Sequence, residues 1–181
     1  MRLFLLLITS FAIISCKDYR NDDSMYWVKF RSHWVKSKFE IDTLNISVSK
    51  FLNGDTEKLI YKSPFDTVTY ILNQAKPELS KFIAPYKGSE NFKFVKDSVV
   101  VLDSKLFKIL HFKMATGVMD IVVEHYWTSD FGVFMVHSST WPNIGILQSR
   151  NQAKNREILG LVKAICPPFF KGKVKEIVPK N

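Results

Sequence analysis

The feature that most constrains the fold is a long alternation of apolar and polar residues in the second half of the chain. It occupies the runs Phe92–Val95, Val99–Leu102, Leu106–Met114, Met119–Trp127 and Val133–Trp141. A period of two places successive side chains on opposite faces, as in a half-buried β-strand. Short turns such as Asp103-Ser104 and Ala115-Thr116-Gly117 separate the runs. The pattern therefore predicts a meander of antiparallel strands.

A helix is predicted directly after this meander. Ser149-Arg150-Asn151-Gln152 is typical of a capping box, in which side chains bond the free N–H groups of a first helical turn. An apolar face at helical spacing follows, and Pro167-Pro168 ends it. That face consists of Ile158, Leu161, Val162 and Ile165. Cys166, next to the prolines, is expected to be a buried structural thiol rather than a nucleophile.

Two more helices are predicted before the meander. Ser63-Pro64-Phe65-Asp66 reads as a helix start, because Ser is a favourable N-cap and Pro suits the first turn. Its expected buried stripe is Phe65, Val68, Ile71 and Leu72. Pro77 interrupts this pattern, and a second short helix is expected to contain Leu79, Phe82 and Ile83.

The first part of the chain mixes two periods. Ser24–Phe39 fits both a helix and a strand, and a short helix is slightly favoured. Leu44, Ile46 and Val48 alternate with polar residues, which indicates a half-buried strand. Asn53-Gly54-Asp55 predicts the turn that follows it.

This order of elements predicts an α+β fold, with an antiparallel meander sheet, helices packed on it and a closing C-terminal helix. The order resembles that of the Mog1/PsbP-like fold. The resemblance implies a non-catalytic binding or assembly factor. A LolA-like half-barrel is the alternative architecture, and it needs more strands than the pattern supplies.

The N-terminus carries a secretion signal. Arg2 precedes an apolar stretch, Leu3–Ile14, that is too short to span a bilayer as a lasting helix. The stretch ends in Ile13-Ile14-Ser15-Cys16, which resembles the lipobox of bacterial lipoproteins. The resemblance implies cleavage before Cys16 and attachment of lipid, including palmitate, to its thiol. The alternative is an ordinary secretory signal with a chance cysteine.

These boundaries divide the chain. Residues 1–15 are the expected signal peptide, 16–24 a lipidated Cys with a polar tether, 25–170 a single domain and 171–181 a basic tail. The anchor implies attachment to a membrane of the bacterial cell envelope, with the outer membrane expected. Four Asp-Ser/Thr triplets, which begin at Asp23, Asp42, Asp66 and Asp97, resemble O-glycosylation acceptors. Helix caps and turns favour the same residues, so both interpretations stay open.

The positive net charge of the chain does not by itself identify a binding partner. The net charge is +9, which favours acidic partners such as phospholipid or anionic glycan. The lysines are dispersed, however, so a solvated surface is expected, and no nucleic-acid interface.

Histidines are the residues that come nearest to a site. A tight turn at Ala115–Gly117 would pair His111 with Ile121, and His111 and His125 would then lie about 13 Å apart along the ladder. His125 and His137 would be diagonal neighbours, and they are the candidate pair for a metal or hydrolytic site. Glu124 is expected on the opposite face. Half-buried sheet histidines without a function are the other interpretation.

The function expected from the sequence is a non-enzymatic binding or assembly module on an envelope lipoprotein. No catalytic residue, cofactor or metal ligand is predicted, and the expected partners are the membrane, through the anchor, and an envelope protein or anionic glycan. A cryptic hydrolase or metal-dependent enzyme that uses His125 and His137 is the alternative. Aromatic residues around the Ser129-Asp130 turn are expected to pack in the core, with a ligand platform as the other reading: Trp127, Phe131, Phe134 and Trp141. A positive φ is expected at Gly132.

Overall fold

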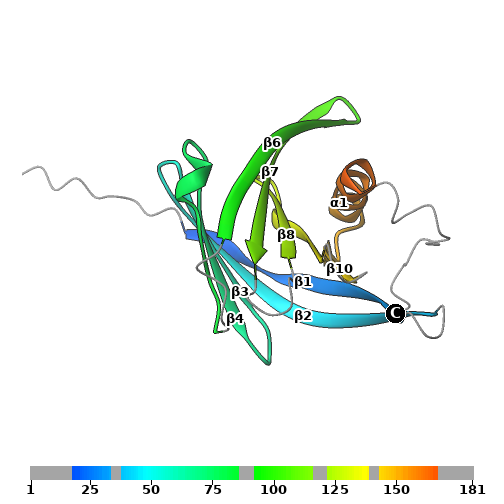
Figure 1. Cartoon of the computed structure of the whole chain (residues 1–181). Coiled ribbons are helices and arrows are strands. Elements are labelled where there is room, and N and C mark those ends of the chain that lie inside the picture. Colours follow the sequence, from blue (N-terminus) through cyan, green and yellow to red (C-terminus); the bar gives the residue numbers. More distant parts are fainter. Residues whose placement is uncertain (1–17, 34–37, 86–91, 116–121, 139–142, 167–181) are drawn as a thin grey trace, which may run out of the picture.

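The protein is described by a computed structural model that covers residues 18–33, 38–85, 92–115, 122–138 and 143–166 (Figure 1). The predicted signal peptide, Cys16 and the basic tail lie outside these residues. The described chain forms a ten-stranded antiparallel sheet and one α-helix at its C-terminal end. The strands are β1 (Asp18–His33), β2 (Lys38–Asn53), β3 (Thr56–Lys62), β4 (Thr67–Asn73), β5 (Lys81–Ile83), β6 (Phe92–Leu102), β7 (Lys105–Ala115), β8 (Val122–Thr128), β9 (Gly132–Ser138) and β10 (Asn143–Ser149).

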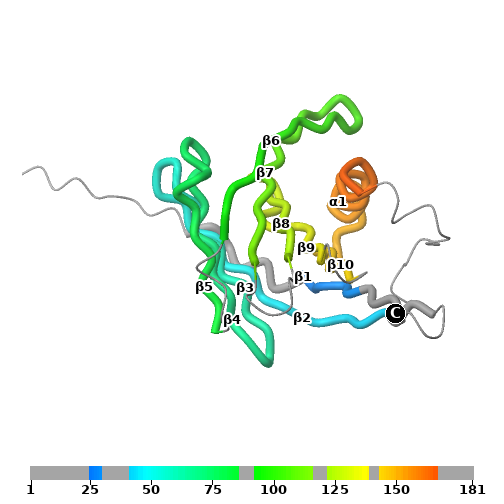
Figure 2. The backbone as a smooth tube through the Cα atoms, viewed as in Figure 1, coloured from blue at the N-terminus to red at the C-terminus, as the bar shows by residue number. Residues whose placement is uncertain are grey.

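The strand order makes the sheet a half-barrel. Within β1–β5 and within β6–β10, each strand pairs with the next one along the chain, and β10 returns to pair with β1 (Figure 2). Among the described strands, β5 and β6 are the only consecutive pair that does not bond. The sheet is therefore a nearly closed ring with one gap, which we call the seam. Across it, the Phe82 and Phe92 rings lie 5.7 Å apart between centroids.

This architecture fits the half-barrel alternative better than a sheet covered by several helices. The antiparallel sheet and the closing helix were predicted. The helix pair was not found, so the order of elements behind the Mog1/PsbP-like resemblance is not the order observed. The extra strands that the half-barrel needs come from the first half of the chain.

The helix predicted from Ser63 is wrong, because the residues after it form β4. The Ser63 hydroxyl accepts hydrogen bonds from the N–H groups of Phe65 and Asp66, as an N-cap would, but here it closes a turn. The residues that follow, Thr67–Ile71, are mostly β-branched and pair with β3. The second predicted helix is reduced to a 3₁₀ turn, η1 (Pro77–Leu79), before β5.

The N-terminal expectations also need correction. The favoured short helix in Ser24–Phe39 is absent, since β1 and β2 pair through most of this segment. β1 begins at Asp18, which lies opposite Phe51. Most of the predicted tether, residues 16–24, therefore lies in β1, and the predicted domain start at residue 25 falls inside that strand. Partners on both sides, β2 and β10, supply the hydrogen bonds that decide for a strand.

The meander is confirmed, with two differences. Phe92–Val95 and Val99–Leu102 belong to one strand, β6, with an irregularity between Phe94 and Lys96. β10 was not predicted. The turn at Asp103-Ser104 is confirmed, and its two residues have φ of 47° and 67°, as a two-residue hairpin turn requires.

The C-terminal helix α1 (Gln152–Ile165) is confirmed as well, with Asn151 rather than Ser149 as its N-cap. Its buried residues are Ile158, Leu161 and Val162. α1 packs outside the curve of the sheet, between β10 and the β6–β7 hairpin (Figure 1). Cys166 caps the helix and is partly buried. No helix among the described residues is long and apolar enough to cross a membrane.

Candidate functional site

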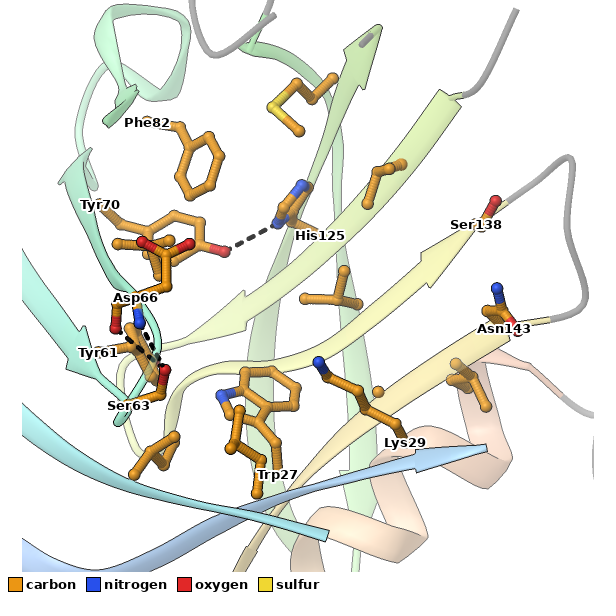
Figure 3. Close-up of a pocket in the computed structure, with 18 residues that line it drawn as sticks. Trp27, Lys29, Tyr61, Ser63, Asp66, Tyr70, Phe82, His125, Ser138 and Asn143 are labelled. Atoms are coloured by element: carbon orange, nitrogen blue, oxygen red, sulfur yellow. Dashed lines mark hydrogen bonds between the residues drawn. The ribbon is translucent and has the colours of Figure 1, made fainter. Parts of the chain in front are cut away.

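The half-barrel encloses a cavity of about 500 Å³ (Figure 3). Inward-facing side chains from both halves of the sheet, β1–β5 and β6–β10, line it. Most of them are apolar or aromatic, and they include Trp27, Tyr61, Tyr70, Phe82, Met114 and Val136. The polar lining residues Ser63, Asp66, Ser138 and Asn143 lie at strand ends, all at the same end of the sheet, and Lys29 and His125 line the cavity further inside the strands. The cavity thus has an apolar interior and a polar rim.

Three hydrogen-bonded contacts connect the two halves across the interior. The Trp127 indole N–H on β8 donates to Glu57 Oε1 on β3 at 3.1 Å. The Tyr61 hydroxyl on β3 accepts from the Val133 N–H on β9 at 2.7 Å. A third contact joins Tyr70 on β4 to a histidine on β8, described below. These contacts join β3 and β4 to β8 and β9 across the interior of the half-barrel.

A buried ion pair lies at the end of the sheet opposite the polar rim. Glu57 is fully buried, and its carboxylate lies 3.1 Å from the Lys50 ammonium. Lys50 also donates to the backbone carbonyl of Ser129 at 2.6 Å. Burial raises the pKa of Glu57, while the Lys50 charge and the hydrogen bonds from Lys50 and Trp127 oppose that rise. The carboxylate is therefore held by its neighbours against a strong desolvation penalty.

His125, on β8, is a polar residue in the wall of the cavity. Its ring is 2% exposed, and its Nδ1 lies 3.0 Å from the Tyr70 hydroxyl (Figure 3). Its Nε2 has no hydrogen-bond partner among the described residues. The rings of Tyr70, Phe82 and Phe92 surround it at centroid distances of 5.7, 5.4 and 5.4 Å. Burial, with a smaller contribution from His111, lowers the pKa of His125 to about 3, so the ring is neutral at pH 7.

The other predicted histidines lie on the opposite face. His111 pairs with Tyr126, and their rings stack at 4.5 Å. His137 pairs with Glu124. The Glu124 carboxylate accepts the Tyr126 hydroxyl at 2.7 Å and pairs with Lys113 at 3.3 Å. This outer cluster, in which His111 is buried and Glu124 and Tyr126 are partly buried, lies on the face of the sheet away from the cavity.

The predicted histidine arrangement was therefore wrong. His111 lies opposite Tyr126 rather than Ile121, a shift of five residues. Because side chains alternate, an odd shift moves every side chain to the other face. His125 pairs with Val136, which places His137 on the opposite side of the sheet. The expectation that Glu124 faces away from His125 is confirmed. Within the described ranges, no group of three or more His, Cys, Asp or Glu is placed to hold a metal ion.

The aromatic residues near the Ser129-Asp130 turn pack as core. Trp127, Phe131 and Phe134 are buried, while Trp141 lies outside the described residues. Gly132 has the expected positive φ, at 74°. Tyr61, Tyr70 and Glu57 were not predicted as residues of the site. The alternation of Glu57, Leu59 and Tyr61 could have indicated an inner strand face.

No known family model matches this chain, and neither the curated proteins nor the solved structures contain a match.

Proposed function

We propose that this chain is a lipid-anchored lipoprotein of the bacterial envelope whose half-barrel binds a small apolar molecule. Its architecture is assigned to the LolA-like half-barrel alternative. The observation that carries the binding function is the apolar cavity. Its volume of about 500 Å³ lies in the range of small-molecule sites, and a few polar groups at its rim and wall accompany the apolar lining. The separation of His125 from His137 removes the geometry that motivated the enzyme alternative.

The anchor is tested by metabolic labelling. In a bacterial host, the full-length chain is expected to incorporate labelled palmitate and to sediment with membranes. Cys16→Ala is expected to lose both properties, because the thiol that carries the lipid is gone. Equal labelling of the two proteins would contradict the anchor. Cys166→Ala is the matched control and is expected to label as the wild type does.

Binding is tested by filling the cavity. Val136 is partly buried, faces the cavity and pairs with His125 and Gly145. Val136→Trp adds an indole to this space and is expected to weaken the binding of a naphthylamine fluorescent probe by at least about tenfold, since the ligand and the new ring compete for one volume. Titration of probe fluorescence measures the affinity.

Val99→Trp is the control for this experiment. Val99 is 64% exposed on β6 and does not line the cavity. This variant is expected to bind the probe as the wild type does. A probe that binds Val136→Trp and the wild type equally, with both proteins folded by circular dichroism, would show that the cavity is not its site.

A further inference from the structure

We propose that His125 Nε2 is the hydrogen-bonding anchor of the cavity, and that the ligand is a compact apolar molecule with one uncharged polar group, a hydroxyl above all. This inference rests on the proposed binding function and adds the chemistry of the ligand. It follows from the placement of a single unpartnered atom.

The atom is unusual because nearly all buried polar groups have a hydrogen-bond partner. His125 is 2% exposed, and its Nδ1 is already held by Tyr70. That bond fixes the plane of the ring, so the direction of Nε2 is fixed as well. An apolar side chain of similar size would avoid the cost of burying an unsatisfied nitrogen. A ligand that bonds Nε2 would remove that cost.

The tautomer of the His125 ring determines which polar group of a ligand can form a hydrogen bond with Nε2. If the Tyr70 hydroxyl donates to Nδ1, then Nε2 carries the hydrogen and needs an acceptor. If Nδ1 donates to the tyrosine oxygen, then Nε2 is itself an acceptor and needs a donor. A hydroxyl both donates and accepts, so it satisfies either tautomer. A carbonyl satisfies the first one alone.

The surroundings of Nε2 exclude a charged head group. Burial lowers the pKa of His125 to about 3, so the ring carries no charge at pH 7 that would attract a carboxylate or phosphate. The neighbouring rings of Phe82 and Phe92 offer no compensating charge either. Lys29 also lines the cavity, but it lies on β1, apart from the cluster of His125, Tyr70 and Phe82 (Figure 3). Moving an ion from water to this depth would be unfavourable, because no group beside Nε2 compensates for the hydration that the ion loses.

The seam gives the polar group of the ligand a path to His125 Nε2. Phe82 and Phe92, the phenylalanine rings next to His125, come from β5 and β6, the two strands that face each other without pairing. β5 comprises three residues and is bonded on one side, to β4. Few hydrogen bonds therefore resist a small displacement of Phe82, and the ring can give way to a ligand.

The test compares two probes of nearly equal shape, 2-naphthol and 2-methylnaphthalene, on the wild type and on His125→Leu. Affinities are measured by quenching of tryptophan fluorescence at pH 7, where the naphthol is uncharged. The ratio of the naphthol affinity to the methylnaphthalene affinity is expected to fall about 3- to 10-fold in the variant, because one hydrogen bond is lost. Comparing this ratio between the wild type and the variant cancels the difference in the cost of removing the two probes from water, because that difference is the same for both proteins.

A second measurement covers the case in which His125→Leu does not fold. In the ¹⁵N-labelled wild type, 2-naphthol is expected to shift the Nε2 resonance of one neutral histidine, and 2-methylnaphthalene is not. An unchanged affinity ratio, or equal shifts with both probes, would overturn the role of His125 and leave the binding function standing. If neither probe binds the wild type, both the binding function and this inference are wrong.

Discussion

Lys50→Met is expected to lower the free energy of unfolding by about 3–5 kcal/mol at pH 7, the usual cost of leaving one member of a buried ion pair alone. Glu57 is fully buried, and within the described residues Lys50 is the cation that pairs with it. Without the ammonium, Trp127 and the long contact from Gln74 Nε2, at 3.4 Å, are left to stabilise the carboxylate. Neither group carries a compensating charge.

The loss should depend on pH in a defined direction. Burial raises the pKa of Glu57 above its ordinary value of 4.5, and removing Lys50 raises it further. Below pH 4.5 the carboxyl is protonated in both the folded and the unfolded chain, so the variant bears little penalty. As the pH rises from 4.5 through the raised folded pKa, the unfolded chain ionises first and stability is lost.

Urea unfolding at pH 4 and at pH 7 measures this difference. The deficit of Lys50→Met relative to the wild type is expected to be small at pH 4 and full at pH 7. The double variant Lys50→Met/Glu57→Gln is expected to recover most of the pH 7 loss, because no buried charge is left. The same deficit at both values of pH, unrelieved in the double variant, would mean that the buried charge is not its cause.

Gly132→Ala is expected to destabilise the fold by about 3 kcal/mol or more, for two independent reasons. The φ of Gly132 is 74°, a region that costs a residue with a Cβ about 1–2 kcal/mol. A Cβ built there would also lie 2.6 Å from the Tyr61 hydroxyl, which must then move. That hydroxyl bonds the Val133 backbone, so its displacement breaks a buried contact across the half-barrel.

Gly54→Ala separates these two causes. Gly54 has a similar φ of 56°, but no atom lies within 4 Å of the position of its Cβ. It is expected to cost about 1–2 kcal/mol, the backbone contribution alone. Thermal and urea unfolding of both variants measure the difference. Equal losses for the two glycines would show that contact with Tyr61 contributes nothing.

The sequence predicts the second half of this fold well because local patterns there agree with the tertiary structure. Each strand of the meander pairs with its sequence neighbour, and the face of α1 is read directly from Ile158, Leu161 and Val162. The first half was misread at Ser63, whose hydroxyl makes the bonds of a helix cap in a turn. The local bonds are the same in both settings, and pairing with β3 decides between them.

The site was harder to predict than the fold because it depends on register. The sequence pairs His125 with His137, but the structure places His137 on the other face of the sheet. The actual partner of His125, Tyr70, is 55 residues away in the chain and lies on a strand that had been read as a helix. No local pattern reports which residues meet across the interior of a curved sheet.

The direction of β1 has a consequence for how the cavity would lie relative to a membrane anchor. Asp18 lies opposite Phe51, near the end of β2, whereas the cavity-lining residues Trp27 and Lys29 lie opposite Leu44 and Asp42, about 23–30 Å further along the sheet. If Cys16 carries the lipid, the membrane is at the end of the half-barrel away from the polar rim. The polar rim of the cavity then faces away from that membrane. A ligand that enters past the polar rim would then come from the aqueous side and not directly from the bilayer.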